Sequence, residues 1–505
     1  MNLRRFLTFL VLLGLSGCAV APFDYPRESS VAISPTEETV LRQWTEDWLA
    51  ANPGPSGFYP LISGHDALGA RLALMDVAEK SIDAQYFMMK GDVAGHVFAA
   101  TMIDAADRGV RVRFLLDDVF TTVSDEELEL LDAHPNIEMR LYNPIARRGI
   151  GAFNFLADFH RANRRMHNKS FIVDNQVAIV GGRNIADEYF ELNPKGVFLD
   201  LDVIGVGPIA AQVSAEFDEF WNDSRSLPMA AFASRFSPED LIQARADIDE
   251  TMRTVVRSAF NAAVNSQLLH DLIDGRQALY SARAEVITDH PSKLTSEIAT
   301  DQEILVQRLA EVISGAEKEV IVFTPYFVPQ EAGVAFWESV VSNGVRVIIL
   351  TNSLASNNHT AVHSGYAKYR KAILDAGVEL YEARVDAIDH SDGNEAEKLT
   401  LHTKAMVIDR EIVFVGSLNL DPRSVEINSE MGVLIHSTEL GEELADRALQ
   451  VIPSIAYRVE LNSKGRLQWR ATIDGEEVIE TSEPLASGWR KFSAFLLKIV
   501  PDSQL

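Results

Sequence analysis

The amino-acid sequence predicts an α/β protein made of two tandem domains related by pseudo-two-fold symmetry. Apolar strands alternate with amphipathic helices in two separate regions, and the two regions share one sequence pattern at a constant offset. A chain of 505 residues is too long for a single small hydrophobic core, and 47% of its residues are hydrophobic, as in an ordinary globular protein. We therefore expect two similar α/β cores that meet at one shared face.

Residues 1–17 have the character of a signal peptide. After two arginines comes an apolar run of ten residues from Phe6 to Leu15, which is too short to span a bilayer. The run leads through Ser-Gly to Cys18, the only cysteine, and this junction resembles the lipobox of bacterial lipoproteins. The resemblance implies cleavage before Cys18 and lipidation of Cys18, with Ala19 favouring the periplasmic side of the outer membrane in a Gram-negative cell. A plain secretory signal with an incidental cysteine is the alternative.

The rest of the chain divides into five regions that differ in composition and periodicity. We expect a lipidated tether with a short helix at 18–56, a first α/β domain at 57–225, a helical insert at 226–290, a second α/β domain at 291–455, and an extension of short strands and a helix at 456–505.

The last region can be interpreted in two ways. It holds equal numbers of basic and acidic residues, whereas the whole chain has a formal charge of −27. The apolar side chains between Trp489 and Ile499 could form a helix on a membrane surface or a terminal helix packed on the second domain. We favour the packed helix, because the segment is short and Ser493 and Ala494 dilute its apolar face.

An internal repeat supports the two-domain prediction. Gly109-Val110-Arg111-Val112 recurs as Gly344-Val345-Arg346-Val347, and the segment 166–184 recurs at 401–419, both at an offset of 235 residues. The same offset holds from residue 109 to residue 184, and such a constant offset indicates that the two regions arose by duplication.

Each copy contains the pattern His-x-Lys-x4-Asp, followed by two small residues and an asparagine. Residues two apart in a strand share a face, so the histidine and the lysine of each copy point the same way. Two histidines can serve as nucleophile and acid in phosphodiester cleavage, and lysines and asparagines can stabilise the phosphate charge without a metal or other cofactor. The two sets are His167, Lys169, Asp174, Gly181, Gly182 and Asn184, and His402, Lys404, Asp409, Gly416, Ser417 and Asn419.

The duplicated motif resembles that of the phospholipase D superfamily, and the resemblance covers nearly the whole chain outside the tether. It implies two phospholipase D-like domains with one shared active site and a reaction through a phosphohistidine intermediate. By this resemblance His167 attacks phosphorus, and His402 protonates the leaving group and then deprotonates an alcohol or water. The spacing does not distinguish the roles of the two histidines.

Two further carboxylates fit this family. Glu430 lies 28 residues after the second motif histidine, and Asp200 aligns with it when the following strands are superposed. In relatives an acidic residue at this place hydrogen-bonds a catalytic histidine and fixes its tautomer; Asp202 is the alternative in the first copy. Asp174 and Asp409 fall at hairpin turns, where aspartate caps the backbone, so we assign them structural roles together with the small residues of the motif.

Three stretches resemble bacterial cardiolipin synthase-like proteins: Arg165 to Lys169, Gly182 to Phe190, and His363 to Tyr366. The lipobox resembles that of the lipoprotein branch of this group. The resemblance implies a membrane-tethered phosphatidyltransferase that acts at a membrane surface on phosphatidylglycerol, with phosphatidylethanolamine as a further candidate substrate. A phospholipase D-type hydrolase, a nuclease and a non-catalytic lipid-binding protein remain the alternatives.

Charge separates some of these alternatives. Loss of residues 1–17 would remove two arginines and leave a charge of −29. So acidic a chain is a poor general nucleic-acid binder, because such binders need clustered lysine and arginine. Because both half-sites lie in one chain, we expect no obligate protein partner.

Overall fold

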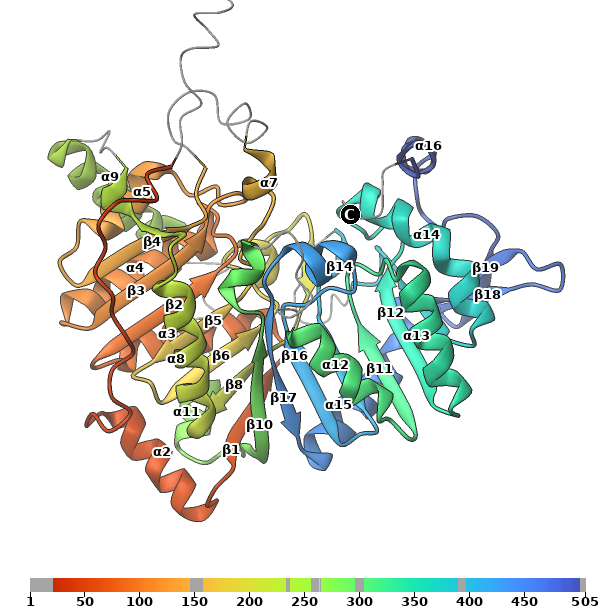
Figure 1. The fold of residues 1–505 in the computed structure, drawn as a ribbon, viewed down its shortest axis with the longest axis horizontal. Helices are drawn as coiled ribbons and strands as arrows, with labels where there is room; N and C mark the ends of the chain where they lie inside the picture. The colour runs from red at the N-terminus through yellow and green to blue at the C-terminus, as the bar shows by residue number, and fades with distance from the viewer. Residues whose placement is uncertain are drawn as a thin grey trace, which may run out of the picture.

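The computed structural model describes residues 21–145, 158–232, 237–255, 263, 265–295, 304–388 and 397–499. The predicted signal peptide and Cys18 lie outside these residues. Two α/β halves stand side by side in the described part of the chain, as Figure 1 shows. None of the described helices has the length and apolarity needed to cross a membrane.

The first half contains a mixed sheet with flanking helices. Its elements are α2 (Val40–Ala51), β1 (Ser56–Leu61), α3 (Gly64–Val77), β2 (Ser81–Tyr86), α4 (Val93–Asp107), β3 (Arg111–Asp117), α5 (Asp125–Asp132), β4 (Ile137–Tyr142), α7 (Phe159–Ala162), β5 (Ser170–Val173), β6 (Val177–Gly181), β7 (Val197–Leu199), β8 (Asp202–Val206), α8 (Pro208–Trp221), β9 (Ser226–Pro228), α9 (Pro238–Val255) and α11 (Leu268–Ile273).

The second half repeats this arrangement and then adds a C-terminal extension. Its elements are β10 (Tyr280–Thr288), α12 (Ile304–Ser314), β11 (Glu319–Phe323), α13 (Gln330–Ser342), β12 (Arg346–Asn352), α14 (Thr360–Asp375), β13 (Glu379–Ala383), β14 (Leu399–Leu401), β15 (Ala405–Ile408), β16 (Ile412–Gly416), β17 (Met431–His436), α15 (Thr438–Ile455), β18 (Ala456–Leu461), β19 (Leu467–Ile473), β20 (Glu476–Glu480) and α16 (Gly488–Leu497).

The two sheets have the same strand order, which is the structural form of the sequence repeat. In the first half the order is β4-β3-β2-β5-β6-β8-β1; β2, β3 and β4 are parallel, β5 is antiparallel to β2, and β5 and β6 form an antiparallel hairpin. In the second it is β13-β12-β11-β15-β16-β17-β10, with the same directions. The parallel strands of each half therefore end at the edge where the motif strand of that half begins.

Strand β10 corrects the interpretation of residues 226–290 as a helical insert. It occupies in the second sheet the place that β1 holds in the first, and it pairs with both β1 and β17. Strand β9 at the start of the segment pairs with β4. Polar residues between the small apolar residues of Tyr280–Thr288 weaken its strand signal. The strand is stabilised by its pairing with β1 and β17, which are distant in the sequence, so local sequence patterns do not reveal it.

One apolar core is shared by the two halves. Buried side chains from β6 and α8 of the first half belong to the same cluster as those from β16 and α15 of the second; examples are Val180, Phe217, Val415 and Leu444. Burial of apolar surface on both sides of the boundary holds the halves in a fixed relation. The motif strands β5 and β15 therefore keep a constant position relative to each other.

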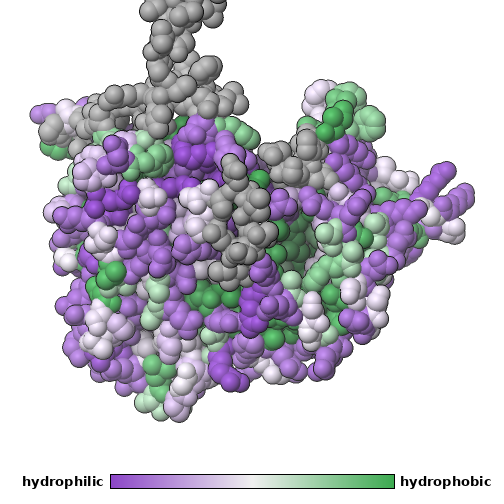
Figure 2. All heavy atoms as spheres, in the orientation of Figure 1, coloured by the Kyte–Doolittle hydropathy of each residue, from purple (hydrophilic) through white to green (hydrophobic). Residues whose placement is uncertain are grey.

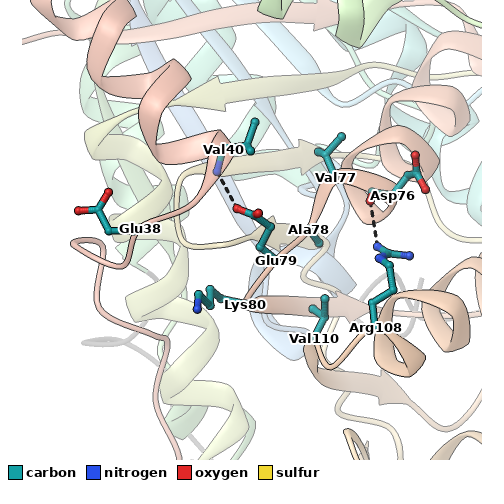
Figure 3. Close-up of a pocket in the computed structure, with 9 residues that line it drawn as sticks. All are labelled: Glu38, Val40, Asp76, Val77, Ala78, Glu79, Lys80, Arg108 and Val110. Atoms are coloured by element: carbon teal, nitrogen blue, oxygen red, sulfur yellow. Dashed lines mark hydrogen bonds between the residues drawn. The ribbon is translucent and has the colours of Figure 1, made fainter.

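Helix α2 of the tether region docks on the first half. Its Val40 backbone N–H donates to a Glu79 carboxylate oxygen at 2.7 Å, beside a surface hollow of about 600 Å³ (Figure 3). Across the hollow, Arg108 donates to the backbone oxygen of Asp76 at 2.9 Å. None of the motif residues lines this hollow, so it is separate from the site described below.

The motif aspartates close equivalent turns in the two halves. The Asp174 carboxylate accepts hydrogen bonds from the backbone N–H groups at 79, 80 and 81, at 2.8 to 3.1 Å, and Asp409 accepts from those at 317, 318 and 319, at 2.7 to 3.0 Å. Both aspartates have a positive φ, 51° and 53°. Each thus ties a hairpin turn to the start of the neighbouring parallel strand, β2 or β11.

We predict that Asp174→Ala destabilises the protein more than the matched change Asp474→Ala, at an exposed turn with φ 52°. Both substitutions place alanine at positive φ and share that cost of about 1–2 kcal/mol. Only Asp174→Ala also removes three backbone hydrogen bonds, which adds about 3 kcal/mol. Urea unfolding followed by circular dichroism measures the difference, and equal midpoints for the two variants would contradict the role given to Asp174.

Candidate active site

The two motif histidines lie at the boundary between the halves, each beside the backbone of the opposite half. The backbone N–H of His167 donates to the Ser429 carbonyl at 2.9 Å, and the backbone N–H of His402 donates to the Leu199 carbonyl at 2.7 Å. Next to the second contact, β7 and β14 form a two-stranded parallel sheet across the boundary. The backbone therefore fixes both histidines relative to each other before any side-chain contact is considered.

Each histidine is hydrogen-bonded by a carboxylate from the other half. His167 Nδ1 lies 2.8 Å from Glu430 Oε2, and His402 Nδ1 lies 2.6 Å from Asp200 Oδ2. Both carboxylates are buried. A carboxylate at Nδ1 favours the tautomer with the proton on Nδ1, which leaves the lone pair of each ring on Nε2. The alternative Asp202 instead forms an ion pair with the buried Arg71 at 2.8 Å.

The motif lysines are buried beside the histidines. Lys169 Nζ donates to the His167 carbonyl at 2.6 Å, and Lys404 Nζ lies 2.7 Å from His402 Nδ1 and also bonds the His402 carbonyl. Burial lowers the pKa of Lys169 to about 7 and that of Lys404 to about 8, although the surrounding carboxylates oppose this. A phosphate between them would favour the charged lysines and raise both pKa values.

Both imidazoles are held neutral. Burial lowers the pKa of His167 to about 4, with Lys169 adding to the effect and Glu430 opposing it. Burial and the neighbouring Lys404 lower the pKa of His402 to about 3. Each histidine is also influenced by the lysine of the opposite half, so the four groups form one electrostatic unit. A neutral, oriented imidazole is what a nitrogen nucleophile requires.

The two motif asparagines are buried, and each donates a hydrogen bond to a side chain of its own half. Asn184 donates to the Tyr189 hydroxyl at 2.9 Å and Asn419 to Ser424 Oγ at 3.3 Å, while Asn419 Oδ1 has no hydrogen-bond partner within the described residues. Gly182 leaves room for Asp200, since a Cβ there would lie 2.2 Å from Asp200 Oδ1.

The other small residues of the motif also allow close approach. A Cβ on Gly181 would lie 2.1 Å from Asp202 Oδ1, and one on Gly416 would lie 2.4 Å from the Met431 carbonyl. At the position equivalent to Gly182, Ser417 donates from its hydroxyl to Glu430. The two half-sites therefore accommodate the buried carboxylate differently: Gly182 leaves space for Asp200, whereas Ser417 hydrogen-bonds Glu430.

Three aromatic residues of the site were not assigned from the sequence. Phe87 contacts the His167 ring edge-on at a centroid distance of 4.7 Å, and Phe198 stacks on the His402 ring at 5.3 Å. The Tyr189 hydroxyl lies 3.5 Å from His402 Nε2. The available signal was position: Phe87 directly follows strand β2, and Tyr189 lies in the stretch that resembles cardiolipin synthases.

The His363–Tyr366 stretch belongs to helix α14, where His363 is part of a buried ionic cluster. His363 Nε2 lies 3.1 Å from Arg370 Nη2, and both side chains are buried. Arg370 in turn pairs with Glu382 and Glu483, both at 2.9 Å. This buried cluster joins α14 to β13 and to the C-terminal segment that leads into α16.

Two α/β halves that present paired histidines and lysines at one boundary define a phospholipase D-like protein of the two-domain kind. Residues 72–221 and 309–451 match the family model described as "Cardiolipin synthase, PLD-like domain". The chain belongs to this family of the phospholipase D superfamily, which confirms the family and the fold class expected from the sequence.

Individual relatives agree with this assignment. The chain is 37% identical over 459 residues to cardiolipin synthase C of Escherichia coli (strain K12), an alignment that covers 89% of this chain and 96% of the relative. It is 31% identical over 514 residues to an uncharacterized protein of Helicobacter pylori (strain 26695), with full coverage of both. The crystal structure of phosphatidylserine synthase from Haemophilus influenzae superposes with a TM-score of 0.58 at 13% identity, covering 92% of this chain and 100% of that one, which supports the fold alone.

We predict that Gly182→Ala disturbs the site more than Ser417→Ala at the equivalent position. The new methyl group would displace Asp200 from His402, at a cost of about 2 kcal/mol. Ser417→Ala adds no atoms: it removes the hydroxyl's hydrogen bonds to Glu430 and from the Met431 N–H, at about 1 kcal/mol each, and leaves Asp200 in contact with His402. Urea unfolding and the ¹⁵N resonances of the His402 ring report stability and tautomer. An unchanged His402 tautomer in Gly182→Ala would contradict the close-packing argument.

Proposed function

We propose that this cardiolipin synthase-like phospholipid enzyme is a membrane-tethered phosphatidyltransferase that acts through a phosphohistidine intermediate. The observation that carries the proposal is the crossed arrangement of two neutral histidines, each oriented by a buried carboxylate and accompanied by a lysine. Orientation at Nδ1 supplies a nucleophilic Nε2, and the lysines supply positive charge for the non-bridging phosphate oxygens.

His167 is the proposed nucleophile. No hydrogen bond within the described residues engages its Nε2, whereas Nε2 of His402 lies near the Tyr189 hydroxyl and 3.2 Å from Lys404 Nζ. In the first step Nε2 of His167 forms a bond to phosphorus, and the bond from phosphorus to the headgroup oxygen breaks. The departing alkoxide takes a proton from His402, whose pKa the negative phosphate raises.

The second step reverses these roles. A hydroxyl group of the acceptor gives its proton to His402, its oxygen attacks phosphorus, and the bond to His167 breaks. With phosphatidylglycerol as donor and acceptor the products are cardiolipin and glycerol; with phosphatidylethanolamine as donor the released alcohol is ethanolamine. With water as acceptor the product is phosphatidic acid, which is the hydrolase alternative.

The proposed tether is an acylated Cys18 at the periplasmic side of the outer membrane. The support is the lipobox-like junction in the sequence and the short apolar run before it. Such an anchor would keep the enzyme at the surface that contains its substrates.

We expect purified protein to form cardiolipin from phosphatidylglycerol vesicles, and His167→Ala or His402→Ala to lower the rate by at least about 10³-fold, because each removes a group that acts on the reacting atoms. His436→Ala, at an exposed histidine of β17, is the matched control and should retain the rate. Products are resolved by chromatography with and without phosphatidylethanolamine.

The products decide between the candidate reactions. Phosphatidic acid without cardiolipin would favour hydrolysis, and binding without turnover would favour a non-catalytic lipid-binding protein. Full activity of either active-site variant would contradict the mechanism.

We expect kcat/KM to fall as the pH rises from 5 to 9, because His402, with a pKa of about 3, must carry a proton to act as the acid in the first step. His167, with a pKa of about 4, is already neutral at pH 5. Lys169, with a pKa of about 7, and Lys404, with a pKa of about 8, lose their protons as the pH rises. The decline is roughly tenfold per pH unit for each essential proton lost, and a rate that rises from pH 7 to pH 9 would refute this assignment.

A further inference from the structure

Helix α16 presents an apolar face that nothing in the described structure covers. Its large apolar side chains and those just after it are between 48% and 85% exposed: Trp489, Phe492, Phe495, Leu496 and Ile499. Only Ala494 of the helix is buried, and α16 otherwise contacts α14. This differs from the sequence-based preference for a packed terminal helix. Figure 2 shows the exposed apolar atoms on this helix, which projects from the body of the protein.

The helix and its flanks carry positive charge in a strongly acidic protein. Between Glu483 and Asp502 the sequence has three basic residues and no acidic one, whereas the whole chain has a net charge of −27. The basic residues are Arg490, Lys491 and Lys498. An apolar face bordered by cations, with a tryptophan at one end, matches a surface of anionic phospholipids.

Polar contacts add to the packing of Ala494 and fix the start of α16. Glu483 pairs with the buried Arg370 at 2.9 Å just before the helix. Ser487 caps the first turn by accepting from the Arg490 N–H at 3.2 Å, and the Arg490 guanidinium donates to the carbonyls of Ala355 and Asn357. The helix is therefore positioned firmly while its apolar side chains remain exposed.

These contacts place α16 on the side of the protein where the active site lies. Residues 353–358 follow the carboxyl end of β12, and Asn352 at that end exchanges two hydrogen bonds, at 2.8 and 2.9 Å, with Leu401, the residue before His402. In the other half, α7 lies shortly before His167, and both α7 and α16 lie along the upper edge of the molecule in Figure 1.

A second apolar contact with the membrane is available at the same edge. Phe120 is 48% exposed, and its ring lies 5.4 Å from Phe87, which contacts the His167 ring. The Phe23 ring lies 4.8 Å from the Arg161 guanidinium of α7. An acyl group on Cys18 would begin only three residues before Ala21, within about 10 Å of it.

We propose that α16 inserts its apolar face into the interface of an anionic bilayer and holds the active-site edge against that membrane. The proposal extends the proposed function by giving the enzyme a second membrane contact besides the Cys18 anchor. The anchor limits distance, and α16 would fix orientation, so that phosphate groups in the bilayer face the boundary where the two histidines lie. A second copy of the chain is also acidic, so charge does not exclude it; we favour the bilayer because α16 lies on the side of the protein where the active site lies.

The test uses the position of a single label. In full-length Cys18→Ser protein, Phe492→Cys provides one thiol on α16 for an environment-sensitive fluorophore. Ser342→Cys, at an exposed position that ends α13 next to the opposite end of β12, provides the matched control. Each labelled protein is mixed with vesicles of brominated phosphatidylglycerol or brominated phosphatidylcholine, whose bromine atoms quench only fluorophores within the bilayer.

We expect phosphatidylglycerol vesicles to quench the label at 492 at least about twofold, with little quenching by phosphatidylcholine vesicles and none at 342. Lys491→Glu with Lys498→Glu should abolish the quenching at 492. Equal quenching at both positions, or none at 492, would overturn the proposal, as would a change at 492 that depends on protein concentration without lipid, which indicates self-association. Because quenching needs no turnover, these outcomes are independent of whether the proposed transfer reaction occurs.

Discussion

The crossed pairing of each histidine with a carboxylate from the opposite half is the interaction on which the site depends. Glu430 pairs with His167 and Asp200 with His402, so neither half alone contains a complete histidine–carboxylate pair. Removing one partner would leave the other as an uncompensated charge or an unoriented ring in a buried place. The shared apolar core and the β10 bridge between the sheets keep both pairs in register.

The same burial that makes these contacts strong also sets the charge state of the site. Two buried lysines face two buried carboxylates, and the low polarity of the boundary keeps both histidines neutral. The lysine charge is then weakly held, because burial disfavours ionised ammonium groups. In the proposed reaction the negative phosphate group supplies a counter-charge to the two lysines.

Much of this arrangement follows from the sequence, because duplication makes local patterns visible twice. The repeat at 235 residues predicted two domains of one fold, and alignment of the strands after the motifs indicated Asp200 and Glu430. The crossing of the pairs was not predictable, since it depends on how two sheets meet. For the same reason the sequence left Phe87, Tyr189 and Phe198 unassigned and hid strand β10, whose partners are far along the chain. The exposure of α16 also depends on what its neighbours leave uncovered.

The continuity of the sheets through β10 constrains how ligands travel. One part of β10 is hydrogen-bonded to β1 and another part to β17. This single strand therefore joins the sheets of the two halves. These backbone hydrogen bonds oppose any movement that would separate the two halves. In the proposed reaction the donor reaches the two histidines at this boundary, and the released alcohol leaves before an acceptor takes its place. Ping-pong kinetics, with donor and acceptor competing for one entrance, is the expected signature of such a rigid frame.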